Sequence, residues 1–557
     1  MRVKTSGSRR YLQIVKSIWD KGNVRQKVIG TVGRFDTLQE TGELDSLLRS
    51  GVRFSEKLAV IDSYEKGQLP STEDVRIGLP LVFERLWKET GISTVIEELL
   101  GDRKYRFSVE RAIFVTVLHR LSVSGSDRAA EKWKEQYRIP GAEGIDLHHL
   151  YRAMAWLGER LPDMDQRGAT PFAPRCMKDL IEEGIFHRSR DLFGDLTLVF
   201  FDTTSIYFEG NGGDSIGAFG HSKDHRPDLK QMVVGIIIDG HGRPVCCELW
   251  PGNTADVETL TPVMERLRHR FGIQRFCIVA DRGMISKETI REIETTQGIQ
   301  YILGVRMRRQ KEVKGEVLGR GGRYEEVYPK TNDSKAPSPL KVKEVMLDKK
   351  RYILCLNEDQ AKKDAMERKA IVAALKDKIQ RGEKTLVGNK GYRKYLKLTG
   401  ARFQIDEDKI REEARYDGKW VLTTNTELSS REVALQYKQL WMVEQIFRSM
   451  KTILSTRPIY HKCDETIRGH VFCSFLSLLL IKELQGRMER KGWQVEWADL
   501  MRDLEELKEI RIQTGSKEVL LRSELKGSAG KALQAAGVAV PPTVRIIAKP
   551  DKDTVDV

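Results

Sequence analysis

The sequence has no long hydrophobic run and no recognisable export signal. Its longest apolar stretch, residues 471–481, is interrupted by Cys473, Ser474 and Ser477 and is far shorter than the roughly 20 residues that span a bilayer. The first residues, MRVKTSGSRRYLQIVKSIWD, contain no apolar core of the kind that a secretory signal needs. We therefore expect a buried helix at 471–481, no membrane partner and a cytoplasmic location.

Cysteine and glycine patterns typical of common binding motifs are also missing. The seven cysteines include no C-x-x-C pair, so zinc-ribbon spacing is absent, and an odd number argues against a disulfide framework. The glycine-rich stretch GEVLGRGG at 315–322 lacks the Lys-Ser/Thr of a phosphate-binding loop. We expect free thiols in a reducing compartment and no nucleotide-binding loop.

What the chain does have is length and positive charge. Its 557 residues predict two to four domains. Lys plus Arg number 95 against 80 for Asp plus Glu, which leaves a net charge of +15. Such an excess favours binding to a polyanion, because each phosphate that is neutralised releases condensed counterions. Simple solubility explains the charge equally well.

The pattern of apolar residues divides the chain into six regions. Alternation around Asp20-Lys-Gly-Asn predicts a hairpin, and short basic helices between 108 and 157 suit either a helix-turn-helix-like DNA reader or generic packing. Strand patterns begin near Asp195, in the order three strands, helix, strand, helix, strand. The expected regions are 1–37 (N-terminal β-hairpin), 38–190 (helical, candidate DNA-binding region), 191–307 (first part of an α/β core), 308–428 (mainly β insertion), 429–485 (completion of the core with a long helix) and 486–557 (helical region and irregular tail).

Two aspartates follow apolar strand patterns. Asp202 follows the run LVFF, and Asp281 ends the run FCIVA. Because strand ends are where open α/β sheets place their ligands, both are candidate site residues. An Asx turn into Thr203 is an alternative explanation for the first, and an ion pair with Arg282 is one for the second.

A long helix predicted from Ser429 onward has a mixed polar edge. At about 100° per residue, a single rim of its apolar arc carries Tyr437, Trp441, Glu444, Arg448 and Lys451. A carboxylate, two cations and a phenol on one half-buried edge suit a metal ligand flanked by phosphate-binding groups. The alternative is an exposed Glu444–Arg448 pair at i, i+4.

Separated carboxylates of this kind are what phosphodiester chemistry requires. Two Mg²⁺ or Mn²⁺ ions act on the attacking and the leaving oxygen, and these hard cations take oxygen ligands. If the predicted elements converge, Asp202, Asp281 and Glu444 would supply such a set.

Three blocks of the sequence, FDTTSIYF, IVADRGMIS and YKQLWMVEQIFRSMK, resemble blocks of the bacterial insertion-sequence DDE transposases. The resemblance is to the branch with a β-rich insertion between the second Asp and the Glu, whose last block reads Tyr-x2-Arg-x3-Glu-x6-Lys. The chain has Tyr437, Glu444 and Lys451 at this spacing but Leu440 at the Arg position. Our hypothesis is that Arg448, one turn beyond the Glu, takes over the phosphate contact. The resemblance covers most of residues 11–485.

The resemblance implies a ribonuclease-H-like α/β core, a mixed five-stranded sheet with helices, interrupted by the mainly β insertion and flanked by helical N-terminal and C-terminal regions. It implies that Asp202, Asp281 and Glu444 are catalytic and hold two Mg²⁺ (or Mn²⁺) ions. Tyr437 and Lys451 would contact DNA phosphates, and Trp441 and Arg448 on the same rim are further candidates for DNA binding.

The reaction implied by the resemblance is hydrolytic nicking at the ends of a mobile element, followed by attack of the freed 3′-hydroxyl on target DNA. The implied partners are double-stranded DNA, both terminal inverted repeats and target, and a second copy of the chain in a synaptic homodimer. A cytoplasmic, nucleoid-associated location follows from these partners.

Three alternatives stay open at this point. One is a nuclease with the same core but no joining step, and another is a catalytically decayed DNA-binding derivative, of which Leu440 would be an early sign. The third is a protein in which the three carboxylates form structural ion pairs. We assign no chemistry to His221, Asp224 and His225, which suit a surface loop, or to His461 and Cys463, which lack a partner at metal-binding spacing.

Overall fold

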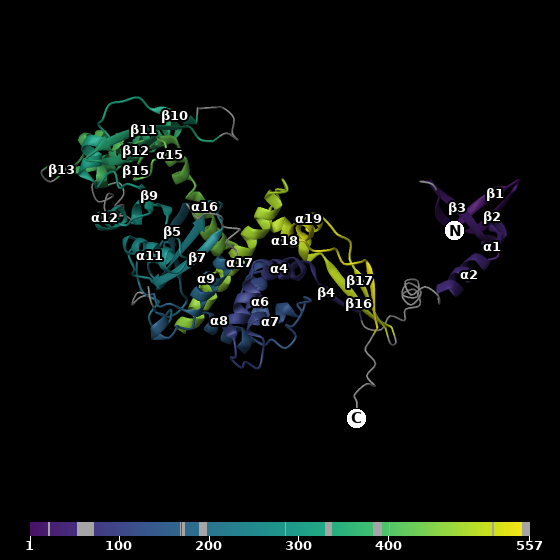
Figure 1. The fold of residues 1–557 in the computed structure, drawn as a ribbon. Helices are drawn as coiled ribbons and strands as arrows, with labels where there is room; N and C mark the ends of the chain where they lie inside the picture. Colours follow the sequence, from purple (N-terminus) through teal and green to yellow (C-terminus); the bar gives the residue numbers. More distant parts are fainter. Residues whose placement is uncertain are drawn as a thin grey trace. The chain divides into compact units, whose positions relative to one another are not determined.

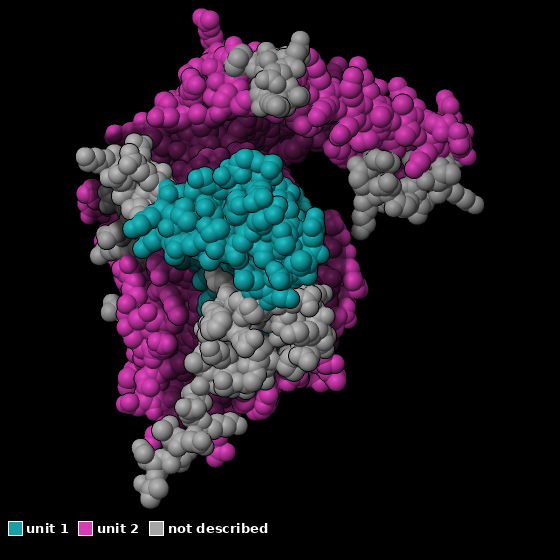
Figure 2. All heavy atoms as spheres, turned by 90° about the vertical axis from the view of Figure 1, so that its right-hand side faces the viewer, with its two compact units in different colours: residues 1–78, 497–530, 539–557 teal, residues 79–496, 531–538 magenta. Residues whose placement is uncertain are grey.

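The computed structural model of the chain divides into two compact units, which Figure 2 colours separately. Residues 1–78, 497–530 and 539–557 form unit 1, and residues 79–496 and 531–538 form unit 2. The residues that the structure describes are 1–20, 23–52, 72–166, 169, 173–188, 198–284, 286–328, 337–381, 393–399, 402–514 and 517–548. No helix among these residues combines the length and apolar character that crossing a membrane requires.

The N-terminal part of unit 1 is a three-stranded antiparallel sheet in the order β1-β2-β3 (Figure 1). The sequence predicted only a hairpin, and the third strand arises because residues 2–6 pair with the first predicted strand in the register Arg2↔Gln13. Two of the predicted turn residues, 21 and 22, lie outside the described residues. The elements are β1 (Arg2–Ser6), β2 (Arg9–Asp20), β3 (Asn23–Arg34), α1 (Phe35–Glu40) and α2 (Glu43–Val52).

A second sheet of unit 1 corrects the prediction for the C-terminal region. Beyond the helical start, residues 508–548 contain three strands, which join a strand from the predicted helical region 38–190 in the order β18-β17-β16-β4. The register Lys508↔Arg76 joins segments that are hundreds of residues apart, and local periodicity cannot reveal such a pairing. The elements are β4 (Thr72–Arg76), α18 (Trp497–Glu505), β16 (Lys508–Thr514), β17 (Lys517–Arg522) and β18 (Val544–Ala548), while α19 (Ala529–Ala536) spans the unit boundary.

The helices of unit 2 pack around α17, which contacts α6 and α8. The Ser108 side chain caps α6, because it accepts a hydrogen bond from the Arg111 N–H. Residues 471–481 lie inside α17 and are buried, as the sequence predicted. The helical elements are α4 (Gly78–Glu89), α5 (Ile92–Leu100), α6 (Val109–Ser122), α7 (Asp127–Lys134), α8 (Leu147–Leu157), η1 (Asp163–Asp165), α9 (Met177–Arg188) and α17 (Asp464–Glu489).

A nine-stranded mixed sheet dominates the rest of unit 2, in the order β10-β11-β12-β15-β9-β8-β5-β6-β7. Strands β5, β8 and β9 run parallel, and the other neighbours are antiparallel. The predicted order of three strands, helix, strand, helix, strand is confirmed. The elements in this order are β5 (Leu198–Tyr207), β6 (Gln231–Asp239), β7 (Pro244–Pro251), η2 (Asp256–Glu258), α11 (Leu260–His269), β8 (Phe276–Ala280), η3 (Arg282–Met284), α12 (Lys287–Thr295) and β9 (Ile299–Gly304).

The range 308–428 differs from the mainly β insertion that the sequence predicted. Its strands β10, β11, β12 and β15 extend the same sheet beyond β9, in the register Leu422↔Gly304, so the sheet has nine strands rather than five. The range also holds the long helix α13, so it is mixed in composition. Its elements are η4 (Val313–Val317), β10 (Glu325–Tyr328), β11 (Leu340–Leu347), β12 (Lys350–Leu356), α13 (Glu358–Arg381), η6 (Arg393–Tyr395), β13 (Leu396–Thr399), β14 (Arg402–Ile405), α14 (Glu407–Ala414) and β15 (Lys419–Thr424).

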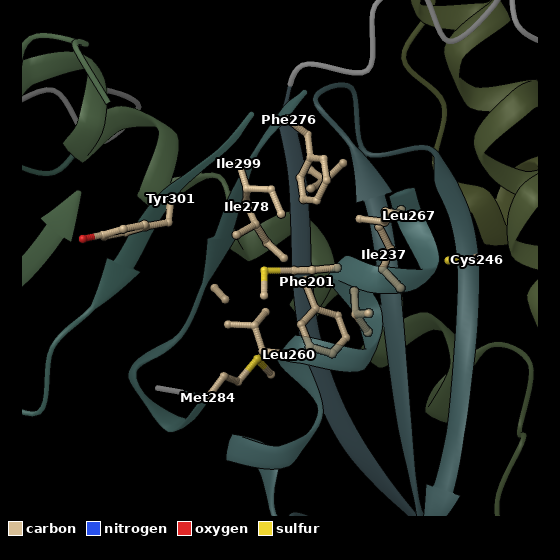
Figure 3. Close-up of a cluster of buried hydrophobic side chains, with 14 of the residues drawn as sticks. Phe201, Ile237, Cys246, Leu260, Leu267, Phe276, Ile278, Met284, Ile299 and Tyr301 are labelled. Atoms are coloured by element: carbon tan, nitrogen blue, oxygen red, sulfur yellow. The ribbon is translucent and has the colours of Figure 1, made fainter. Parts of the chain in front are cut away.

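One face of the sheet is covered by α11 and α12, and their apolar side chains share a core with the central strands. Phe201 of β5, Ile278 of β8 and Leu260 of α11 belong to this cluster (Figure 3). Because successive side chains of a strand point to opposite faces, the residues next to these core positions face the other side of the sheet, where α15 (Ser430–Lys438) and α16 (Trp441–Thr452) pack against it.

Candidate catalytic site

Neighbouring parallel strands bring Asp202 and Asp281 side by side. In the register of β5 and β8, Phe201 is paired with Ala280, and both of these side chains lie in the apolar core. The residue after each of them is an aspartate, Asp202 or Asp281, which therefore points away from that core. Asp281 follows the end of β8, as predicted, whereas Asp202 lies in the middle of β5.

Glu444 comes to the same place from a helix that is shorter than predicted. The single long helix expected from Ser429 is two helices, α15 and α16, separated at Gln439 and Leu440. At this break the backbone N–H groups of both residues donate to carbonyl oxygens three positions earlier, which tightens the turn. The rotation of 100° per residue therefore does not carry across the break, and Tyr437 lies on α15 while Glu444 lies in the first turn of α16.

The three predicted carboxylates line one cavity of about 260 Å³. Among the described residues, no Lys or Arg side-chain nitrogen lies within 4.0 Å of a carboxylate oxygen of these three residues. The alternative explanations of Asp281 paired with Arg282, and of Glu444 paired with Arg448, are thus not seen in the structure. The cavity is lined by Asp202, Asp281, Trp420, Tyr437, Lys438, Leu440, Trp441 and Glu444.

Tyr437 is attached to one of these carboxylates. Its Oη donates a hydrogen bond of 2.9 Å to Asp281 Oδ1. Burial raises the pKa of Tyr437 far above its ordinary value, and the neighbouring Asp281 acts in the same direction, so the phenol keeps its proton. Gly304 makes room for this contact, because a Cβ at that position would lie 2.4 Å from the phenol oxygen.

The environment of Asp202 disfavours its charge when no cation is bound. Burial raises the pKa of Asp202 to about 6, and the charges of Asp281 and Asp256 add to this effect, whereas Lys223 and the Thr203 N–H oppose it. The Thr203 N–H donates to Asp202 Oδ1 at 2.7 Å, an Asx-like contact within the strand. Three carboxylates with oxygen donors and no bound counter-charge fit the preference of hard divalent cations.

The other predicted DNA-binding residues differ in their surroundings. Trp441 lines the cavity and is 51% exposed. Arg448 is exposed and does not belong to the cavity lining. Lys451 is half-buried, and its Nζ donates to Thr204 Oγ1 at 2.6 Å and to Asp224 Oδ1 at 2.8 Å.

Family comparisons agree with this geometry. Residues 194–480, just over half of the chain, match the model described as transposase DDE domain. This range contains all three carboxylates. The chain belongs to the DDE transposases. Residues 1–63 of the transposase also match the model described as IS1634 family transposase, N-terminal domain. A search of curated proteins finds no match to the transposase.

Several residues around the site of this transposase escaped the sequence analysis. Lys438 and Trp420 line the cavity, and Lys438 precedes by two positions the Leu440 that replaces the motif arginine. Asp256 accepts a hydrogen bond of 2.6 Å from the Thr203 hydroxyl. Asp224, interpreted from the sequence as part of a surface loop, has a side chain that is only 6% exposed. The loop pattern GHSKDHRPD gave no signal of this burial.

A second polar cluster in the transposase also differs from expectation. His461 lies with His470 and Asp127, and one potential ligand atom from each falls within 4.8 Å of the others. Asp127 is far from the two histidines in the sequence, so no spacing motif marks this cluster. The Arg120 guanidinium, however, contacts His470 Nδ1 at 2.9 Å, so the lone pair that a metal would need already accepts a hydrogen bond.

Proposed function

We propose that the protein is the transposase of an insertion sequence, which cleaves DNA at the ends of its element and joins the freed 3′-hydroxyl to target DNA. The observation that carries the proposal is the cavity in which Asp202, Asp281 and Glu444 meet with no ion-pair partner among the described residues. Membership of the DDE transposases supplies the reaction class.

In this proposal the three carboxylates hold two Mg²⁺ (or Mn²⁺) ions. Such ions, when bound, activate the attacking oxygen and stabilise the leaving oxygen of a phosphodiester. Asp202 and Asp281 are fixed by the paired register of β5 and β8, and Tyr437 holds the Asp281 carboxylate in place through its hydrogen bond. The sheet order β7-β6-β5-β8-β9 serves as the ribonuclease-H-like core, and 308–428 as its insertion.

The DNA strand is proposed to pass over the cavity mouth. Trp441 offers an exposed aromatic surface at the cavity. Lys438 also lines the cavity, and we propose that its ammonium, which lies over the Tyr328 ring in the DNA-free structure, replaces the motif arginine when DNA is bound. Lys451 has three N–H donors; two contact Thr204 and Asp224, and the third is proposed to bind a phosphate oxygen. Arg448, exposed on the same helix, is a further phosphate contact in this proposal.

An arginine-rich cavity beside Asp281 supports the same DNA path. It measures about 330 Å³ and is lined by Arg282, Arg306, Met307, Arg308 and Arg309. Arg306 donates to the backbone carbonyls of Arg282 and Gly283, so its charge is not neutralised by these contacts. Changing Arg282 and Arg309 to Ser is expected to reduce the slope of log affinity against log salt by about 1 per lost phosphate contact.

The remaining parts are proposed to serve DNA recognition and assembly. The helical residues 38–190 are the candidate DNA reader, and a homodimer on paired element ends is the expected working form. The protein would act on double-stranded DNA at the nucleoid in the cytoplasm.

The direct test uses oligonucleotides with the inverted repeats that flank the coding region, incubated with protein, Mg²⁺ and a target plasmid. We expect nicks that leave a 3′-hydroxyl at the repeat end, and covalent joint products. Nicks without joint products would indicate a nuclease with the same core, and specific binding without any cleavage would indicate a decayed derivative. Either result would contradict the proposal.

A further inference from the structure

The loop between β5 and β6 contacts the strand that carries Asp202. Residues 220–228 follow β5 in the chain, and the Lys223 N–H donates to Ser205 Oγ of β5 at 2.8 Å. Its neighbour Asp224 is buried, although both flanking stretches of the loop are polar. A buried carboxylate in a polar loop is costly unless cations pair with it, so its contacts indicate what the loop does.

Asp224 joins two cations from the segment that carries Glu444. Its Oδ1 lies 2.8 Å from Lys451 Nζ near the end of α16 and 2.8 Å from Arg457 Nη1 in the segment after that helix. Lys451 Nζ also donates to Thr204 Oγ1 of β5. Asp224 therefore joins α16 to the segment that follows it, and its partner Lys451 extends the link to the central strand.

The Asp224–Lys451–Thr204 contacts lie on the face of β5 that carries Asp202 and on the side of α16 that carries Glu444. Thr204 follows Asp202 by two positions, so both side chains lie on the same face of β5. Lys451 follows Glu444 by seven positions, which is close to two turns, so both lie on one side of α16 about 10 Å apart along its axis. The Lys451–Thr204 contact thus fixes the helix position from which Glu444 faces Asp202.

The preceding residue makes a parallel link on the other side of β5. Lys223 Nζ donates to the Thr203 carbonyl at 2.9 Å and to Thr203 Oγ1 at 2.7 Å, and it pairs with Asp256 at 3.2 Å. The Lys223–Asp224 dipeptide therefore ties η2 to one side of the strand and α16 to the other.

We propose that Asp224 is a positioning residue of the transposase, which sets α16, and with it Glu444, against the strand of Asp202. Its consequence for catalysis rests on the proposed function. Without the Asp224 charge, Lys451 and Arg457 would face each other with no shared counter-charge, and the helix end would move away from β5.

The test compares Asp224→Asn with Asp228→Asn in the full chain. Asp228 is the matched control because it lies in the same loop and pairs with Arg226, but it is 59% exposed. Amide hydrogen exchange of residues 441–452 and Mn²⁺ affinity are measured without DNA. For Asp224→Asn we expect roughly tenfold faster exchange in α16 and Mn²⁺ affinity about tenfold weaker, the range for losing a partner that orients metal ligands. The control should match the wild type in both.

Catalysis supplies a second readout, which is taken per mole of folded protein so that loss of folded protein does not count. Asp224→Asn should lower kcat for end cleavage about 10-fold to 100-fold without raising KM for DNA, because removal of a negative charge does not weaken DNA binding. Thr204→Val cuts the same link from the strand side and should change α16 exchange in the same direction. If Asp224 acts through Lys451, the double variant Asp224→Asn with Lys451→Gln should lower kcat by no more than the more harmful of the two single substitutions does.

The outcomes separate this inference from the proposed function. Folded Asp224→Asn and Thr204→Val proteins with wild-type α16 exchange and wild-type Mn²⁺ affinity would overturn the positioning role. If Asp202→Asn bound Mn²⁺ as tightly as the wild type, the proposed function would be overturned instead. The comparison of amide exchange would still decide whether Asp224 holds α16.

Discussion

Two groups of acidic side chains in unit 2 differ in how their charge is balanced. In the first group, Asp202, Asp281 and Glu444 line a cavity without an ion-pair partner among the described residues. In the second group, acids of α9 and β7 are paired with buried cations of α9 and α11 and with Arg270, directly after α11. These pairs are Lys178–Asp179, Arg270–Asp179, Arg270–Glu183 and Arg266–Glu248.

The difference separates a structural charge cluster from a binding site. Burial opposes ionisation of Asp179, but Lys178 and Arg270 outweigh it and hold its pKa below its ordinary value. At Asp202 burial prevails, and the pKa rises to about 6. In the buried network the acids have cationic partners within the chain, although burial raises the pKa of its member Glu182 to about 7. The cavity carboxylates have no ion-pair partner among the described residues, which is why we propose that a bound cation balances their charge.

The largest expected effect comes from removing a cavity carboxylate. Asp202→Asn, Asp281→Asn and Glu444→Gln should each lower DNA cleavage by roughly 10³-fold or more, on the order of 4 kcal/mol of transition-state stabilisation. Folding should be retained because no cation loses its partner. A gel assay of end cleavage measures the loss, and wild-type cleavage by any of the three would remove that residue from the site.

In the buried network, by contrast, removing a charged side chain should lower the stability of the fold. Arg270→Met leaves Asp179 and Glu183 without one of their cations, so the free energy of unfolding should fall by about 3–5 kcal/mol. Urea unfolding followed by circular dichroism measures this. Arg103→Met is the control, because Arg103 and Glu159 are both 42% exposed and such pairs contribute about 1 kcal/mol or less. Equal losses of unfolding free energy in the two variants would show that the buried network contributes no more to stability than an exposed ion pair.

The two groups should also differ in their dependence on pH. Because the pKa of Asp202 is raised, this group stabilises the metal-free fold below its unfolded value of about 4, and the contribution is lost as pH rises through about 6. Asp202→Asn does not titrate, so its stability advantage over the wild type should grow from near zero at pH 4 to on the order of 2 kcal/mol above pH 7.

Thermal melting with EDTA across this pH range measures the difference. Mg²⁺ should stabilise the wild type and not Asp202→Asn, since metal binds the ionised carboxylate. A constant difference between the two proteins at all pH values would contradict the raised pKa.

A smaller effect is expected at the side-chain hydrogen bond that orients Asp281. Tyr437→Phe removes the donor to Asp281 and should lower cleavage about tenfold, within the range for groups that orient metal ligands. Gly304→Ala should act similarly, because the added Cβ would displace the phenol. Single-turnover cleavage rates measure both, and unchanged rates would show that the hydrogen bond does not matter for the site.

Strand and helix patterns were sufficient to predict the central part of the fold. Runs of apolar residues mark β5 and β8, and the aspartates next to them could be singled out because each interrupts such a run. The predicted strand and helix order through β9 is confirmed. Glu444 depended on its resemblance to a family block, because a helical Glu beside an Arg has an ordinary surface explanation.

The errors arose where long-range contacts decide the structure. The pairing of β15 with β9 joins strands of the expected insertion to the sheet of the core, which local patterns do not reveal, and the pairing of β16 with β4 makes strands of a region expected to be helical or irregular. The break at Leu440 depends on hydrogen bonds to carbonyls three positions earlier, in a sequence without Gly or Pro. The burial of Asp224 results from its cationic partners on a distant helix, which the loop sequence does not reveal.

If Asp202, Asp281 and Glu444 form a divalent-metal site, Mn²⁺ should bind in their cavity, and anomalous diffraction from crystals grown or soaked with Mn²⁺ would locate it. We expect anomalous peaks within bonding distance of oxygens of all three carboxylates, and these peaks should disappear in Asp202→Asn. Wild-type crystals whose cavity shows no Mn²⁺ peak, or a peak that persists in Asp202→Asn, would contradict this expectation.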